Sequence, residues 1–501
     1  MPHAVRSWPT RMNAMDALFW TMDRIPELRS TIAVLMVLER PPTRARLKEE
    51  FERLSAEFVR MRQRVIDVPF ALAPPEWVDD RQFDLDYHLR YVAVPAPGRM
   101  EDLLAELGPL YATSLDHDRP LWEAYAAEGL QDGRSAVFLK MHHCMVDGVG
   151  GSRLFQSLLR ERHGSSEVAS RAEEARPTDA AALVWRAFLY NLRAGGHVVA
   201  EVARMIGSAA LHPAATTANI ESQLRMLTGL TRQLLVTRAR SPLHAGRSLS
   251  RRLATLEMSL TDIDAVRAPL GATINDIVLT VVSGAMHRWH ALHGTDVKEL
   301  RALVPVNLRA QDESESGNRI AMLAIALPVG EPDPLRRLRI IQERIGHVKS
   351  DRRATLYPLV AGAVFRLPLP LAETIARQQT TGANFVCTNV PGPRQTYRLA
   401  GVRIEKIYPF TPLVGDHPIA IALLSYRDVL YVGLDVDPLG MDDLPSFRAA
   451  LQDAYVEVLG CQPPVEVQPT RGPRKTPVRR RTASSFPSPS RDGQHHHAVH
   501  I

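Results

Sequence analysis

A strand pattern that ends in two histidines constrains this chain more than any other feature. Residues 135–141 form a short apolar run with β-branched and aromatic side chains, which follows an Asp-Gly turn and is typical of a strand. His142 and His143 come next and begin the pattern HHxxxDG, which ends at Gly148. Helical spacing resumes after Ser152, a residue type favoured as an N-cap. We therefore expect the histidines in a loop between a strand and a helix, where a rigid scaffold can present them to a substrate.

The histidine pair, taken alone, is compatible with more than one chemistry. Neighbouring side chains on an extended backbone point to opposite sides, which disfavours a shared metal ion, and the chain has no HExxH or CxxC motif. Ser152 follows two glycines but lacks the GxSxG pattern of a serine nucleophile. Cys144 is expected to face away from His143 by the same alternation, which favours an ordinary buried cysteine. No metal site is predicted.

General-base catalysis remains for these histidines. A histidine with a pKa of about 6.5 takes a proton from a hydroxyl group at neutral pH if its ring is held in place. Asp147 is expected to shape the loop, and Gly148 permits a turn that a side chain would obstruct.

The length of the chain predicts two domains. A chain of 501 residues exceeds what one hydrophobic core usually supports. Strand-like runs such as 31–38 alternate with amphipathic helical patterns, which indicates an α/β fold with layers of sheet and helix. The predicted parts are a first domain over 1–163 with the HHxxxDG motif, a linker and basic helical segment over 164–245, a second domain over 246–462, and a disordered basic tail over 463–501.

The second half contains a helix start with a polar residue away from its apolar face. Thr273 and Asp276 form the pattern of a capping box, and apolar residues follow at helical spacing. Asn275 lies in the first turn, off that apolar face. The strand-like segments of this half are 253–260, 303–306, 322–328, 385–388, 404–408, 419–425 and 429–436.

The formal net charge of +6 comes from the end of the chain. Seven cations and one anion lie between Val467 and Ile501, so the remainder is neutral overall. This tail is rich in Pro, Ser and Arg and has no apolar periodicity, which is typical of disorder. We favour a solvated extension over an electrostatic tether to anionic lipid or nucleic acid, and we expect no nucleic-acid partner.

The central segment is also basic. Residues 180–240 contain seven arginines and two glutamates, together with Trp185, Phe188 and Tyr190. Such a segment either lies at a membrane interface or packs as a crossover between the two domains, and the sequence leaves both open.

Cysteine content and hydropathy predict the compartment. The three cysteines, Cys144, Cys387 and Cys461, are far apart and odd in number, which argues against a disulfide framework and for a reducing environment. No window offers the roughly 20 consecutive apolar residues that a membrane-spanning helix needs. A cytoplasmic protein is predicted, with peripheral binding to the inner face of the membrane as a further possibility.

A set of motifs carries a resemblance to a known family. HHxxxDG in this setting resembles the superfamily of chloramphenicol acetyltransferases and condensation domains, which are acyltransferases. From about Met12 to Gln462 the chain is more specifically similar to the bacterial wax ester synthase/acyl-CoA:diacylglycerol acyltransferase family. The further matching motifs are Met15-Asp16-Ala17-Leu18-Phe19, Pro120-Leu121-Trp122, Asn275-Asp276, Gly317-Asn318 and Asn389-Val390-Pro391-Gly392-Pro393.

The resemblance implies a fold and a mechanism. It implies two chloramphenicol-acetyltransferase-like domains, with mixed sheets flanked by helices, that meet around a tunnel with His143 at their junction. His143 would take the proton of an alcohol that attacks the thioester of a long-chain acyl-CoA, without metal, prosthetic group or covalent acyl-enzyme. His142 and Asp147 would support the site. Asn275 is a candidate donor to the oxyanion, on side-chain and helix-dipole grounds.

Two residues have candidate roles in substrate binding, and three functional readings stay open. Gly148 and Asp276 are the candidates, although Asp276 is equally explained as a helix cap. The favoured activity makes triacylglycerol from diacylglycerol, or wax ester from a fatty alcohol. A condensation or polyketide-associated acyltransferase is the related alternative, weakened by the absence of a DFGWG-type motif and of a carrier domain. A non-catalytic lipid-binding protein at a membrane surface is the alternative from another class.

Overall fold

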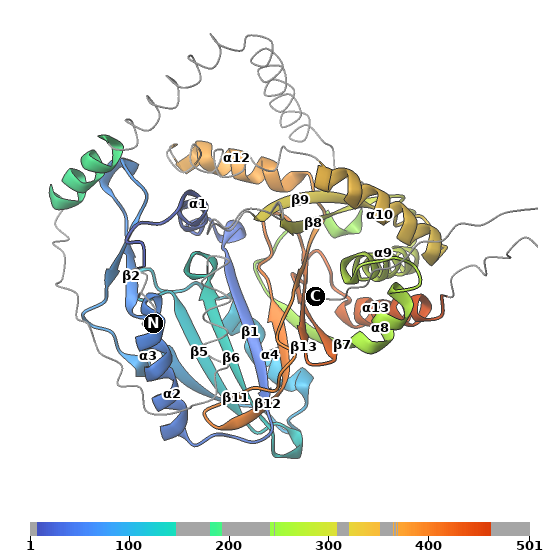
Figure 1. Ribbon diagram of the computed structural model, residues 1–501, viewed down its shortest axis with the longest axis horizontal. Helices are drawn as coiled ribbons and strands as arrows, with labels where there is room; N and C mark the ends of the chain where they lie inside the picture. The colour runs from blue at the N-terminus through green and yellow to red at the C-terminus, as the bar shows by residue number, and fades with distance from the viewer. Residues whose placement is uncertain are drawn as a thin grey trace, which may run out of the picture. The chain divides into compact units, whose positions relative to one another are not determined.

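Two mixed β-sheets with helices packed against them make up most of the structure (Figure 1). The structure is a computed structural model that describes residues 8–146, 181–192, 241–244, 246–307, 320–350, 364, 367 and 369–461. Within these residues each large sheet has six strands, and a small sheet pairs β2 (Gln63–Ile66) with β3 (Glu76–Asp79). The predicted α/β fold with mixed, helix-flanked sheets is confirmed.

The first sheet carries the two histidines at the end of an inner strand. Its strands, in order across the sheet, are β11 (Arg398–Leu399), β12 (Val402–Phe410), β1 (Thr31–Leu38), β6 (Ser135–His142), β5 (Trp122–Glu128) and β4 (Leu89–Ala93). The pair β4 and β5 is parallel, and the other described pairs are antiparallel. Every residue of β6 is buried, which explains why its sequence is a nearly continuous apolar run.

The second sheet has a comparable mixed arrangement. Its strands, in order, are β7 (Arg252–Ser259), β14 (Val429–Val436), β13 (Ile419–Tyr426), β10 (Phe385–Val390), β8 (Leu300–Asn307) and β9 (Ile320–Leu327). Here β10 pairs in parallel with both β13 and β8. All seven strand segments predicted for this half fall on these strands or on β12, and those over 253–260 and 322–328 extend one residue beyond the observed strand.

Helices cover both sheets. Those of the first half are α1 (Ala14–Met22), α2 (Arg44–Glu57), α3 (Leu85–His88), α4 (Met100–Ala112) and a helix over 181–192. Those of the second half are α8 (Leu260–Arg267), α9 (Ile274–Leu292), α10 (Pro334–Ser350), α12 (Leu369–Thr381) and α13 (Leu444–Leu459). The predicted capping box begins α9, because the backbone N–H of Thr273 donates to Asp276 Oδ2 (2.8 Å) and the N–H of Asp276 donates to Thr273 Oγ1 (3.2 Å).

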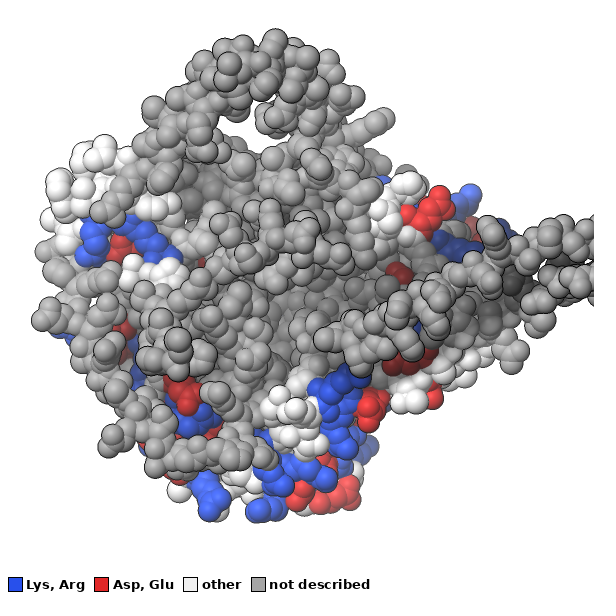
Figure 2. All heavy atoms as spheres, in the orientation of Figure 1, with Lys and Arg blue, Asp and Glu red and all other residues white. Residues whose placement is uncertain are grey.

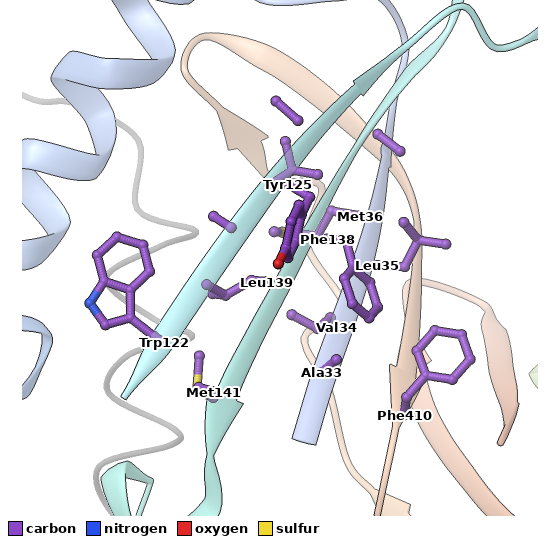
Figure 3. Close-up of a cluster of buried hydrophobic side chains, with 14 of the residues drawn as sticks. Ala33, Val34, Leu35, Met36, Trp122, Tyr125, Phe138, Leu139, Met141 and Phe410 are labelled. Carbon is purple, nitrogen blue, oxygen red and sulfur yellow. The ribbon is translucent and has the colours of Figure 1, made fainter. Parts of the chain in front are cut away.

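β12 ties the two halves of the sequence together. It belongs to the second half of the chain but pairs with β1, so that Ala33 lies opposite Phe410. Phe410 joins the core of the first sheet, where its ring centroid lies 6.1 Å from that of Phe138 (Figure 3). A Cβ atom at Gly433 of β14 would lie 1.8 Å from the Pro409 oxygen, so glycine alone allows β14 to approach β12 this closely.

Several predictions fall outside the described residues. These are Asp147 and Gly148, the helix after Ser152, most of the central segment and the basic tail. The predicted domain boundaries after residues 163, 245 and 462 lie there as well and stay predictions. Within the central segment the structure describes the helix over 181–192 and a short turn, η6 (Pro242–His244). In the described parts of the chain, no helix is long and apolar enough to cross a membrane.

Candidate active site

The turn after β6 holds its two histidines in different surroundings. Nδ1 of His142 accepts a hydrogen bond from the N–H of Cys144 (3.1 Å) and thereby caps the turn η5 (His143–Met145). The N–H of His143 donates to the carbonyl of Ser30 at 2.8 Å, which fixes the backbone of the turn. His142 is fully buried, whereas His143 is partly exposed. Of the two rings, His143 is therefore the one that a substrate can reach.

His143 sits against α1 and is neutral at pH 7. Its ring centroid lies 4.6 Å from that of Phe19. Its Nδ1 atom is enclosed and has no hydrogen-bond partner among the residues that the structure describes. Burial is the main cause that lowers the pKa of His143 to about 4, and the neighbouring His142 adds to it. The ring is therefore unprotonated at neutral pH and able to accept a proton.

A buried carboxylate lies behind these histidines. Asp23, directly after α1, accepts a hydrogen bond from His117 Nε2 at its Oδ2 atom (2.8 Å), and its Oδ1 atom lies 3.1 Å from His142 Nε2. The N–H of Ser30 donates to Oδ1 as well, at 3.2 Å. Burial alone would raise the pKa of Asp23, but the contacts with both histidines hold it well below its usual range. The site thus contains a permanent buried anion.

At the start of α9, Asn275 is exposed and Asp276 is buried. Asp276 is buried, and its carboxylate is engaged in the capping box, which accounts for its presence without any substrate. Asn275 lies off the buried face of the helix and is exposed, and its Oδ1 atom accepts a hydrogen bond from Asn389 Nδ2 at 2.8 Å. Because this bond occupies the acceptor end of the Asn275 amide, its NH2 end is the one that a substrate oxygen can meet.

The predicted site residues that the structure describes form two groups. His142 and His143 are adjacent at the end of β6, and Asn275 and Asp276 are adjacent at the start of α9. That Asn275 lies opposite His143 stays a prediction. In the part of the chain that the structure describes, no group of three or more His, Cys, Asp or Glu residues has the arrangement of a metal site.

Comparison with known proteins identifies the family. The description "Wax ester synthase/diacylglycerol acyltransferase catalytic domain" matches residues 12–278, and "WS/DGAT C-terminal domain" matches residues 316–458. The chain belongs to this family of acyltransferases. A Mycobacterium tuberculosis protein named as a probable diacylglycerol O-acyltransferase is 30% identical over 472 residues, which cover 92% of this chain and 98% of the relative. A second protein of that organism, named as a putative enzyme of the same kind, is 30% identical over 458 residues, or 89% and 91% of the two chains.

Solved structures support the fold of this family member. The wax ester synthase/diacylglycerol acyltransferase from Marinobacter aquaeolei VT8 is similar with a TM-score of 0.61 at 23% identity, covering 90% of this chain and 98% of that one. The first condensation domain of the CDA synthetase is similar with a TM-score of 0.54 at 16% identity, covering 91% and 97%. The expected relationship to condensation-domain folds is therefore confirmed.

Sequence reasoning missed three polar residues of the site. Asp23 and His117 are 94 residues apart in the sequence and meet only through the packing of α1 against the first sheet. Asn389 belongs to a motif that marks a turn, and nothing local shows that it contacts Asn275. Asp23 closely follows the Met15–Phe19 motif, and His117 precedes the Pro120–Trp122 motif. Their position beside these motifs marks both residues as candidates, but it does not reveal that they contact each other.

Proposed function

We propose that this family member transfers a long-chain acyl group from acyl-CoA to the hydroxyl group of diacylglycerol, and also accepts a fatty alcohol. The names of its relatives support the substrate class. The observation that carries the proposal is a neutral, partly exposed His143 whose backbone is fixed at the end of β6. An unprotonated ring that a substrate can reach is able to accept the proton of an alcohol.

The proposed reaction is a direct transfer. His143 takes the hydroxyl proton while the alcohol oxygen bonds to the thioester carbonyl carbon, and the C=O electron pair moves to the oxygen. When the carbonyl re-forms, the C–S bond breaks and the thiolate of coenzyme A leaves. The His143 imidazolium returns the proton to this thiolate, so an ester and free coenzyme A are produced and the enzyme is unchanged.

Asn275 is the proposed donor to the oxyanion of the intermediate. Its NH2 group is directed by the bond from Asn389, and it lies in the first turn of α9, where the helix dipole favours negative charge. An amide donor that is already oriented needs little reorganisation when charge develops. Asp276 is assigned the role of keeping this helix start in place rather than that of binding substrate directly.

The remaining residues are assigned supporting roles. We assign to His142 the role of holding the turn that carries His143, because it is buried and caps η5. For Asp147 and Gly148 the proposal stays that of the sequence, with Asp147 shaping the loop and Gly148 allowing its turn and the approach of substrate.

A direct product assay tests the proposal. Purified full-length protein is incubated with labelled palmitoyl-CoA and either dioleoylglycerol or hexadecanol, and the products are separated by thin-layer chromatography. Labelled triacylglycerol supports the proposal, and labelled wax ester with hexadecanol supports the second acceptor. If the label stays in acyl-CoA with both acceptors, the protein is not an acyltransferase for these substrates, and a non-catalytic lipid-binding protein is favoured.

We further propose that a surface around residues 181–192 binds peripherally to a membrane or lipid droplet, where diacylglycerol is found. One face of this helix is fixed to the protein, since Arg186 pairs with Glu76 (2.9 Å) and Asn191 Nδ2 donates to the carbonyl of Leu72 (2.6 Å). The other face exposes Trp185 and Phe188, which stack with ring centroids 5.6 Å apart.

The neighbouring loop adds to this apolar surface. Phe70 is 93% exposed and is held there in a left-handed backbone conformation with φ of 57°. Phe70, Trp185 and Phe188 contribute to an open cavity of about 650 Å³ whose described lining is apolar. The place of this helix in Figure 1 corresponds to a largely uncharged area in Figure 2, with charged side chains along one side. Exposed aromatic side chains beside charged ones suit the interface of a lipid layer.

A further inference from the structure

The carboxylate of Asp23 links three segments that are far apart in the sequence. Asp23 follows α1, His117 precedes β5, and His142 ends β6. The distances are 2.8 Å from Asp23 Oδ2 to His117 Nε2 and 3.1 Å from Asp23 Oδ1 to His142 Nε2. Asp23 is 4% exposed, and a charge at that depth is tolerated only with such partners.

The partners of each ring nitrogen fix the positions of the protons. The N–H of Cys144 donates to Nδ1 of His142, so neutral His142 carries its proton on Nε2, the atom that faces Asp23. An ionised carboxylate can only accept, so His117 also contributes an Nε2–H. In this arrangement Asp23 faces an N–H group of each histidine.

A second route connects Asp23 to His143 through the backbone. The N–H of Ser30 donates to Asp23 Oδ1 at 3.2 Å, and the carbonyl of the same residue accepts the N–H of His143 at 2.8 Å. The carboxylate thus supports the turn at two points, through the ring of His142 and through Ser30. Loss of the negative charge would loosen both supports at once.

We infer that Asp23 is a positioning residue for His143 and that His117 holds the Asp23 carboxylate in place. This inference rests on the proposed role of His143 as the base. The ring of Trp20 packs on that of His117 with centroids 4.4 Å apart, which restricts the imidazole. His117 is itself accessible, since its side chain is 34% exposed, so it can be changed without opening the core.

The first test measures turnover of full-length variants with palmitoyl-CoA and dioleoylglycerol. Asp23→Asn keeps the size of the side chain but removes its charge and one acceptor oxygen. We expect kcat to fall roughly 100-fold, the loss produced when a reacting group is misplaced by about 1 Å, with KM for palmitoyl-CoA changed less than about twofold. The control, Asp118→Asn, removes an exposed carboxylate next to His117 and should retain wild-type turnover.

A matched pair at His117 tests the hydrogen bond without altering the buried carboxylate. His117→Gln retains an N–H donor near the position of Nε2, whereas His117→Phe retains the ring beside Trp20 but has no donor. We expect the glutamine variant to stay within about threefold of wild-type kcat and the phenylalanine variant to lose at least about tenfold. Equal activity of the two variants would overturn the role of His117. This pair also keeps the inference testable if Asp23→Asn does not fold.

Hydrogen exchange separates the inference from the proposed function. The His143 amide is protected by its bond to Ser30 in the wild type, and we expect its exchange to become at least about tenfold faster in Asp23→Asn, while β1 and β6 stay protected. Unchanged exchange at His143, or wild-type kcat in Asp23→Asn, would refute the positioning role. Absence of turnover in the wild-type protein would instead refute the proposed function, and the exchange experiment would still give its answer.

Discussion

The side-chain amide of Asn389 donates a hydrogen bond to the side-chain oxygen of Asn275 over 2.8 Å. The donor lies near the end of β10 and the acceptor in the first turn of α9, so the bond joins a strand end of the second sheet to a helix start. Its direction leaves the NH2 group of Asn275 to face other acceptors at the positive end of the helix. The roles proposed for the two residues are therefore separable, with Asn275 as donor to the substrate and Asn389 as the residue that orients it.

The two asparagines should differ in how much they contribute to turnover. Asn275→Ala removes the proposed oxyanion donor, and kcat should fall by about 10²- to 10³-fold. Asn389→Ala leaves that donor present but unguided, and the loss of one neutral hydrogen bond, about 1 kcal/mol, should lower kcat roughly fivefold. Steady-state kinetics with palmitoyl-CoA and dioleoylglycerol measure both. Near-wild-type turnover of Asn275→Ala would exclude Asn275 as the donor.

Substitution of the two histidines should affect turnover and thermal stability differently. His143→Ala should reduce acyl transfer from palmitoyl-CoA by at least about 10²- to 10⁴-fold, because the proton acceptor is gone, while the thermal midpoint stays near that of the wild type. His142→Ala should be milder in turnover but lower the thermal midpoint, because it removes a buried side chain that caps η5 and contacts Asp23. Undiminished activity of His143→Ala would refute the mechanism.

The pH dependence of kcat/KM should reveal the lowered pKa of His143. In the proposed mechanism the neutral ring is the active form, so activity should be retained above the folded-state pKa and lost as pH falls through it. With that pKa lowered to about 4, rather than about 6.5 for a free histidine, kcat/KM should stay flat from pH 8 to below pH 6 and decline only further down.

The stability of the folded protein limits the lowest pH at which kcat/KM can be measured. An unfolded chain protonates His143 below about 6.5, whereas the folded chain does not until about 4, so this residue makes folding less favourable as pH falls across that interval. Far-UV circular dichroism at each pH therefore serves as the control. A decline in kcat/KM centred near pH 6.5 while the protein remains folded would contradict the assigned environment of His143.

Local sequence patterns predicted many strands of this fold, but they did not predict the contacts between segments that are far apart in the sequence. The strands over 31–38 and 429–436 were predicted to the residue, because apolar β-branched runs between turns depend on near neighbours. The placement of β12 beside β1 depends on pairing between segments more than 360 residues apart, which no local pattern encodes. The site follows the same rule, since His143 is visible as a motif but Asp23 becomes part of the site only when α1 packs near it.

Because Gly433 of β14 lies so close to Pro409 of β12, replacing this glycine with alanine should destabilise the protein. In Gly433→Ala the new Cβ atom would lie 1.8 Å from the Pro409 oxygen, so β14 or β12 must move. We expect the free energy of unfolding to fall by about 1–3 kcal/mol, the usual cost of overpacking. Chemical denaturation measures this change.

A second glycine supplies the matched control. Gly346 lies in α10, where an added Cβ atom would meet nothing within 4 Å. Gly346→Ala should leave the stability unchanged or raise it by up to about 1 kcal/mol, because alanine is the better helix former. Equal effects of the two substitutions would show that β14 and β12 are not held at the distance described.

The apolar surface around residues 181–192 should bind lipid vesicles through its aromatic side chains. We expect the full-length protein to float with vesicles of phosphatidylcholine and phosphatidylglycerol. Phe70→Ser combined with Trp185→Ser should lower the bound fraction at least about tenfold, since burying each aromatic side chain contributes about 1.5–3 kcal/mol. Leu292→Ser is the control, because Leu292 is 69% exposed at the end of α9, remote in sequence from this surface.

Binding should persist at high salt, because it depends mainly on apolar contact. A wild-type protein that does not float even at low salt would rule out this surface as a lipid interface, and one whose binding disappears only with added salt would assign the binding to its basic segments instead.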